Sequence, residues 1–340
     1  MRMIRNKLIS VFMGLVAVQG SALAKELHVY SHRHYEADQK VNKLFTEKTG
    51  IEVKVVNAEV DQLVERLRSE GESSPADVLI AVDAGRLQRA AAEGLLQPVE
   101  TEILKERTPE AMRSPEGHWY PFTLRARVIV AAKDRVKAGE IKGYADLAKP
   151  EWRGRVLSRS SSSGYTQALL ASIVAAEGEA AALRWAEGLT RNMARPPQGG
   201  DTDQIKAVAS GLADVAITNS YYLGLLLNSP DPKERKVGQS VAIIFSDPSG
   251  RGTHTNVSGA GVVKHSKNVD AATKYIEFLV SDEVQKIYAN ETFEHPVMMD
   301  LSMGEQLQEW GEFKVDQETF PKLGESAPAA IRIFDKVGWK

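Results

Sequence analysis

Tyrosine occurs at three places where a predicted strand is followed by a predicted helix. Tyr35 follows the first such strand, Tyr165 follows a short strand and the serine run 160–163, and the pair Tyr221-Tyr222 follows a third. In open α/β sheets, ligands bind beyond the carboxyl ends of the strands, where such junctions lie. Four of the nine tyrosines of the chain occupy this kind of position. We therefore expect these four phenol groups to meet at one binding site.

A cluster of tyrosines suits a small metal ion of high charge. A phenolate is a hard, anionic oxygen donor, and the phenol has a pKa of about 10, so the metal must displace its proton. Several phenolates repel one another until an ion such as Fe(III) neutralises them, and four phenolates on Fe(III) leave a single negative charge. Arg125 and Arg127, on one face of a predicted strand, could offset that charge. Zinc prefers imidazole or thiolate and calcium prefers carboxylates and carbonyls, and neither set is assembled here.

Each of these features also has an ordinary structural explanation. A Tyr-Tyr pair most often packs with its hydroxyls at the surface, and a serine run before a helix is usually a cap or a turn. His32 and His34 have a spacing that could chelate a metal, but most isolated pairs of this kind arise by chance. Arg125 and Arg127 could simply form salt bridges. Only the coincidence of three junctions favours a metal site.

The first 24 residues are typical of a secretory signal peptide. Arg2, Arg5 and Lys7 precede an apolar stretch over 8–18, and Ala22-Leu23-Ala24 is a small-x-small cleavage site. The apolar stretch is shorter than the roughly 20 residues that span a bilayer. The formal net charge of −2 argues against a nucleic-acid partner, and the chain has no cysteine for a lipid anchor or a disulfide. We expect export to the periplasm.

Short apolar runs alternate with amphipathic stretches, which predicts an α/β fold. We expect strands over 27–30, 51–56, 77–82, 127–132, 156–158, 214–218, 241–245 and 261–263, and one long helix over 271–289. Because no single linker divides the chain, we expect two lobes with crossings near 124–127 and 249–252. The predicted division is a signal peptide over 1–24, a first lobe over 25–125 plus 250–300, and a second lobe over 126–249 plus 301–340.

Several motifs resemble those of the periplasmic ferric-ion-binding proteins of bacterial ABC importers. The matching stretches are 30–35 (YSHRHY), 73–78 (SSPADV), 125–128 (RARV), 159–165 (RSSSSGY), 219–222 (NSYY) and 250–254 (GRGTH). The final Gly338-Trp339-Lys340 is similar to the cyanobacterial-type branch of that family. The resemblance covers essentially the whole mature chain.

The resemblance implies a two-lobed type II periplasmic binding protein that closes over iron in the cleft between its lobes, on hinge strands. Tyr35 from one lobe, and Tyr165, Tyr221 and Tyr222 from the other, are then the phenolate ligands. His34 matches a residue that is a fifth ligand in some members and unbound in others. Arg125 matches an arginine near the iron, and we favour it over Arg127. Some relatives carry a further arginine one turn after the tyrosine pair, where this chain has leucine and glycine over 223–226.

The resemblance also implies the partners. We expect Fe(III) as cargo, with Fe(II) as the alternative oxidation state, and leave open whether a carbonate or similar anion completes the site. The receiving partner is the permease of an iron ABC importer, and we expect a monomeric protein that is not an enzyme. The alternatives are a carrier of the same fold for polyamine, sulfate, phosphate or thiamine, and a secreted α/β enzyme. Against the enzyme, the chain lacks a nucleophile elbow, an HExxH helix and a P-loop.

Overall fold

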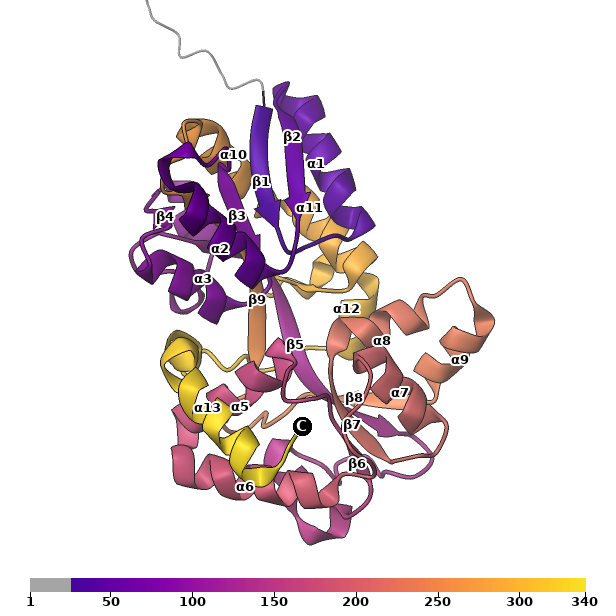
Figure 1. Ribbon diagram of the computed structural model, residues 1–340. Helices are drawn as coiled ribbons and strands as arrows, with labels where there is room; N and C mark the ends of the chain where they lie inside the picture. Colours follow the sequence, from indigo (N-terminus) through magenta and orange to yellow (C-terminus); the bar gives the residue numbers. More distant parts are fainter. Residues whose placement is uncertain (1–25) are drawn as a thin grey trace, which may run out of the picture.

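The computed structural model describes residues 26–340, so the predicted signal peptide lies outside the described residues. Within 26–340, no helix has the length and apolar character needed to cross a membrane. Strands and helices alternate along the chain and form two lobes, which Figure 1 shows one above the other.

The first lobe is built on a mixed sheet with the order β2-β1-β3-β9-β5. β1 pairs in parallel with β2 and β3, whereas β9 is antiparallel to both β3 and β5. The strands are β1 (Glu26–Ser31), β2 (Glu52–Asn57), β3 (Val78–Ala81), β4 (Leu96–Gln97), β5 (Tyr120–Ala132), β9 (Thr255–Val263) and β10 (His295–Pro296). The helices around them are α1 (Glu36–Thr49), α2 (Val60–Glu70), α3 (Ala84–Ala92), α4 (Glu102–Arg107), α10 (Val269–Leu279) and α11 (Asp282–Ile287).

The second lobe is built on the far half of β5. This half pairs antiparallel with β7 and β8, and β7 pairs in parallel with β6. The strands are β6 (Val156–Leu157), β7 (Val215–Asn219) and β8 (Val241–Ile244). The helices are α5 (Gly164–Glu177), α6 (Glu179–Asn192), α7 (Asp201–Ala209), α8 (Ser220–Leu227), α9 (Pro232–Gln239), α12 (Glu305–Trp310) and α13 (Leu323–Val337). The C-terminal α13 packs on α5 and α6 and also contacts α3 of the first lobe.

β5 joins the two lobes, and Figure 1 shows it running from one into the other. All of its residues from Tyr120 to Ala132 are buried. Ala126 pairs with Thr255 of β9, whereas Arg127 pairs with Asn219 of β7, so the partner strand changes between these neighbours. This change lies within the predicted crossing 124–127. The exact division of the chain between the lobes stays a prediction.

Three sequence predictions differ from the structure. β5 begins at Tyr120, seven residues before the predicted strand over 127–132. β9 begins at Thr255, six residues before the predicted strand, because its polar residues are buried between β3 and β5 and carry no apolar pattern. The predicted helix over 271–289 is wrong as a single element. It is divided at Val280 and Ser281 into α10 and α11, and a π-helix over Tyr288–Thr292 follows.

Candidate metal centre

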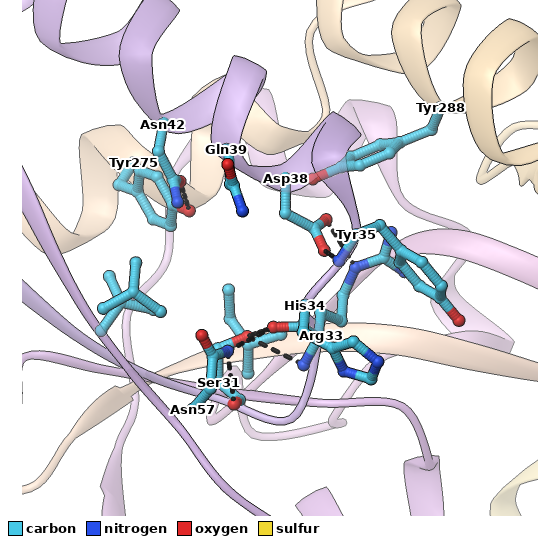
Figure 2. Close-up of a pocket in the computed structure, with 13 residues that line it drawn as sticks. Ser31, Arg33, His34, Tyr35, Asp38, Gln39, Asn42, Asn57, Tyr275 and Tyr288 are labelled. Atoms are coloured by element: carbon cyan, nitrogen blue, oxygen red, sulfur yellow. Dashed lines mark hydrogen bonds and ion pairs between the residues drawn. The ribbon is translucent and has the colours of Figure 1, made fainter.

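Tyr35 lies at the junction between β1 and α1, where it is the N-cap residue of the helix in an extended conformation. Its backbone N–H donates to Asp38 Oδ2 at 3.0 Å, and Arg33 Nε donates to Asp38 Oδ1 at 2.8 Å. These bonds satisfy the backbone N–H of Tyr35 at the start of the helix and hold the Asp38 carboxylate in place. Figure 2 shows the Tyr35 ring extending away from Asp38.

A cavity of about 100 Å³ lies behind Tyr35, and Figure 2 shows the side chains that line it. Its wall includes Asp38, Asn42, Asn57 and Tyr275. Protein interiors are normally close-packed. The cavity therefore leaves unfilled space next to Tyr35.

The other three tyrosines begin two helices of the second lobe. Tyr165 is the second residue of α5, and Tyr221 and Tyr222 are the second and third residues of α8. The rings of Tyr221 and Tyr222 lie 4.2 Å apart between centroids. The hydroxyl oxygens of Tyr165 and Tyr221 are 3.3 Å apart, so these two junctions meet directly.

The charges of the four phenol groups influence one another. Burial raises the pKa of Tyr221 well above its usual value, and the neighbouring phenols of Tyr165, Tyr35 and Tyr222 raise this pKa further. Burial also raises the pKa of Tyr222, and Tyr165 adds to that rise. Burial raises the pKa of Tyr35, against the opposing charge of Arg125. The structure therefore brings the four predicted side chains within electrostatic range of one another.

Arg125 and Arg127 are both buried, but they face different tyrosines. The guanidinium carbon of Arg125 is 5.8 Å from the Tyr221 ring centroid, and that of Arg127 is 5.9 Å from the Tyr165 ring centroid. Arg125 donates to the Glu294 carboxylate at 2.5 Å, whereas Arg127 is paired with Asp201. Arg125 and Arg127 therefore form salt bridges, as the ordinary explanation predicted, and they also lie beside the tyrosines, as the metal-site hypothesis predicted.

Two further arginines lie beside the tyrosines, and the sequence reasoning missed both. Arg33 lies 5.0 Å from the ring of Tyr35, and Arg159 lies 5.7 Å from the ring of Tyr165 and 2.9 Å from Asp201. Arg33 lies in the stretch 30–35 and Arg159 in the stretch 159–165, and both stretches carry the family resemblance. That resemblance is the signal by which the two arginines could have been found.

Counting the charged side chains around the phenols gives a small excess of positive charge. The cations are Arg33, Arg125, Arg127 and Arg159, and the anions bonded to them are Asp38, Asp201 and Glu294. One positive charge is left over. This excess equals the single negative charge of Fe(III) bound by four phenolates, so an iron complex would be electrically balanced in this setting.

The two histidines have different surroundings. His34 is exposed, and its ring stacks on Tyr35 with centroids 5.6 Å apart, while His32 Nε2 is 3.2 Å from a Glu59 oxygen. Within 26–340, no group of three or more His, Asp or Glu side chains is arranged to hold a metal ion. Phenol oxygens are therefore the donors that gather in the described chain.

The serine run forms a turn before α5. Ser160 Oγ accepts from the N–H of Ser162 at 3.1 Å, and Ser163 is the N-cap residue. The side-chain oxygens of Ser163 and Thr166 are buried without a hydrogen-bond partner. The predicted turn is thus present. α8 holds no charged residue after its tyrosine pair, and Leu225 is exposed there.

The fold defines a class of protein, a two-lobed binding protein, and the four candidate ligand groups lie at strand-to-helix junctions. Residues 40–315 match the family of bacterial extracellular solute-binding proteins, and the chain belongs to this family. The predicted fold class is confirmed.

Within this family, the chain is similar to iron-binding members. It is 47% identical over 316 residues to iron uptake protein A1 of Synechocystis sp., a match that covers 93% of this chain and 88% of the relative. The structure of Trichodesmium IdiA (FutA) in complex with iron and citrate ligands is 44% identical, with a TM-score of 0.89 and coverage of 93% and 100%. The ferric binding protein from Campylobacter jejuni is 42% identical, with a TM-score of 0.87 and coverage of 92% and 100%. The predicted resemblance to ferric-ion-binding proteins of the cyanobacterial-type branch is confirmed.

Proposed function

We propose that this chain is a periplasmic solute-binding protein that captures Fe(III) with the phenolates of Tyr35, Tyr165, Tyr221 and Tyr222 and delivers it to an ABC importer. One observation carries the proposal. Phenol groups from three separate strand-to-helix junctions lie within electrostatic range of one another, and the hydroxyls of Tyr165 and Tyr221 are 3.3 Å apart. Tyr221 is buried and the other three tyrosines are half-buried, so their hydroxyl oxygens form a compact donor set that a single metal ion could join.

Iron binding is an exchange of protons for a metal ion. A tyrosine phenol is ordinarily neutral at pH 7, and Fe(III) can displace its proton because a trivalent ion stabilises a phenolate strongly. The four surrounding arginines reduce the cost of placing negative oxygens in a buried site.

Closure of the two lobes completes the coordination. Tyr35 belongs to α1 of the first lobe, whereas the other three ligands belong to α5 and α8 of the second. β5 and β9 run between the lobes and serve as the hinge, which bends as the lobes approach each other. We place the lobes at 25–125 plus 250–300 and at 126–249 plus 301–340.

The remaining assignments are also part of the proposal. The protein is a monomer that hands iron to a membrane permease and performs no turnover. His34 is close enough to Tyr35, by ring stacking at 5.6 Å, to serve as a fifth ligand in the closed form. An anion such as carbonate could bind at the N-terminus of α5, where backbone N–H groups face the site.

Visible spectroscopy with ferric citrate tests the proposal. A coloured band from phenolate-to-iron charge transfer should appear, and the double variant Tyr221→Phe/Tyr222→Phe should not retain iron, because Phe keeps the rings and removes the donor oxygens. Tyr30→Phe is the matched control, since the Tyr30 hydroxyl bonds Glu70 at 2.9 Å and faces away from the cluster. Absence of the band in the wild-type protein, with binding of a polyamine, sulfate, phosphate or thiamine instead, would refute the proposal.

A further inference from the structure

A buried carboxylate follows an irregular segment beside the candidate metal centre. The π-helix Tyr288–Thr292 ends at Phe293, whose φ of 56° lies in the left-handed region, and Glu294 comes next. The Glu294 side chain is fully buried. A π-helix and a bulky residue with positive φ are both unfavourable, and such features concentrate at functional sites.

Glu294 binds two arginines that are far apart in sequence. Its Oε1 accepts from Arg125 Nε at 2.5 Å and from Arg33 Nη1 at 3.0 Å, and its Oε2 accepts from Thr292 Oγ1 at 3.1 Å. Ser258 Oγ of β9 accepts from the same two arginines, at 2.7 Å from Arg33 and 2.6 Å from Arg125. Burial would raise the pKa of Glu294, but Arg33 and Arg125 hold it below its usual value. The carboxylate is therefore a charged link between the two guanidinium groups.

The two arginines face tyrosines of different lobes. The guanidinium carbon of Arg33 is 5.0 Å from the ring of Tyr35, and that of Arg125 is 5.8 Å from the ring of Tyr221. The Glu294 carboxylate is thus hydrogen-bonded both to the arginine beside Tyr35 and to the arginine beside Tyr221.

The segment that carries Glu294 also packs on the helix that carries the tyrosine pair. A Cβ atom built on Gly224 of α8 would lie 2.5 Å from Cβ and Cγ of Phe293. Only glycine allows this close approach. The position of Glu294 is therefore tied to α8 as well as to the two arginines.

We propose that Glu294 is a positioning residue for the candidate metal centre, holding Arg33 and Arg125 against the phenolates and setting the charge that they present to the metal. This inference rests on the proposed function. Without the carboxylate, Arg33 would keep Asp38 as a partner but Arg125 would have no carboxylate partner, and the surroundings would carry two excess positive charges instead of one.

The charge balance makes the role measurable. Reduction of bound Fe(III) to Fe(II) adds one negative charge to the complex, so a more positive environment favours Fe(II). Glu294→Gln adds one positive charge nearby and keeps the size of the side chain. At a separation of about 10 Å and an effective dielectric constant of about 20, the ratio of Fe(II) affinity to Fe(III) affinity should rise roughly tenfold.

The experiment compares three variants in the full mature chain, using ferric citrate for Fe(III) and anaerobic ferrous sulfate for Fe(II). Glu294→Gln should raise the affinity ratio. Glu294→Asp keeps the charge but is one methylene shorter, so it should leave the ratio within roughly twofold and weaken Fe(III) binding severalfold, because the arginines are held less firmly. Asp77→Asn is the control, since Asp77 is 2% exposed and bonds the backbone N–H of His28 at 2.9 Å, at the opposite end of β3 from the metal centre. It should change neither quantity.

The outcomes separate this inference from the proposed function. If the wild-type protein binds no iron, the proposed function fails. If it binds iron but Glu294→Gln leaves the affinity ratio unchanged or lowers it, the role of Glu294 is refuted. The role of Glu294 is also refuted if Asp77→Asn shifts the affinity ratio as much as Glu294→Gln does. It is refuted as well if Glu294→Asp binds Fe(III) with the wild-type affinity. Should Glu294→Gln not fold, the Glu294→Asp result decides alone.

Discussion

Proton release on iron binding provides a quantitative test of the ligand set. Tyrosine is neutral at pH 7, and burial raises the pKa of Tyr35, Tyr221 and Tyr222 further above that pH. Four phenols that become four phenolates should therefore release roughly four protons per iron, and the affinity for Fe(III) should increase with pH. Tyr222→Phe removes one hydroxyl and keeps the ring, whose centroid lies 4.2 Å from that of Tyr221. This variant should release roughly one proton fewer per iron. Its affinity for Fe(III) should therefore rise by about tenfold less per pH unit than the affinity of the wild-type protein.

Calorimetry in two buffers of different ionisation enthalpy counts the protons. The same ferric chelate is used for both proteins, so proton uptake by the chelator cancels in the difference. The charge-transfer absorbance provides a second readout and should fall by roughly a quarter, because one of four donor oxygens is lost.

A matched control uses a tyrosine outside the cluster. Tyr275 is buried and its hydroxyl bonds Asn42 at 2.5 Å, so Tyr275→Phe should release the wild-type number of protons. The reasoning is wrong if Tyr222→Phe binds iron with an unchanged proton count and an unchanged absorbance, since Tyr222 would then not be a ligand.

Two further predictions concern stability. Gly224→Ala should lower the free energy of unfolding by about 1–3 kcal/mol, because its methyl group would lie 2.5 Å from Phe293. Gly324→Ala in α13 should raise the free energy of unfolding by about 0.5–1 kcal/mol, because a Cβ at that position would have no neighbouring atom within 4 Å. Urea unfolding measures both, and equal effects would show that α8 can move away from Phe293. Because the pKa values of Tyr35, Tyr221 and Tyr222 are raised in the folded state, the free energy of unfolding of the iron-free protein should be level below about pH 10 and fall above it. Alkaline denaturation followed by circular dichroism checks this, and stability that rises above that pH would contradict it.

Local patterns predicted the parts of the site that depend on chain order. The positions of Tyr35, Tyr165 and the pair Tyr221-Tyr222 could be predicted because strand periodicity, followed by a helix start, is visible over a few residues. Since the ends of such strands gather at one place in an α/β fold, the sequence alone predicts that these residues lie near one another. The absence of cysteine, read directly from the composition, excluded thiolate ligands.

Elements without a local apolar pattern escaped prediction. Thr255 to Ser258 of β9 are buried on both faces although they include threonine, asparagine and serine. Their burial depends on β3 and β5, which lie far away in the sequence. The break between α10 and α11 was missed because Val280 continues the apolar pattern across it.

The sequence by itself determined the class of fold and pointed to the candidate donor groups, because both depend on residue types and on short-range periodicity. The tertiary structure alone decided how the charges around those donors are balanced. Arg33 and Glu294 are 261 positions apart, and Arg127 and Asp201 are 74 positions apart. No local signal relates such residues, since only the folding of β5, β9 and the segment before β10 brings their side chains into contact.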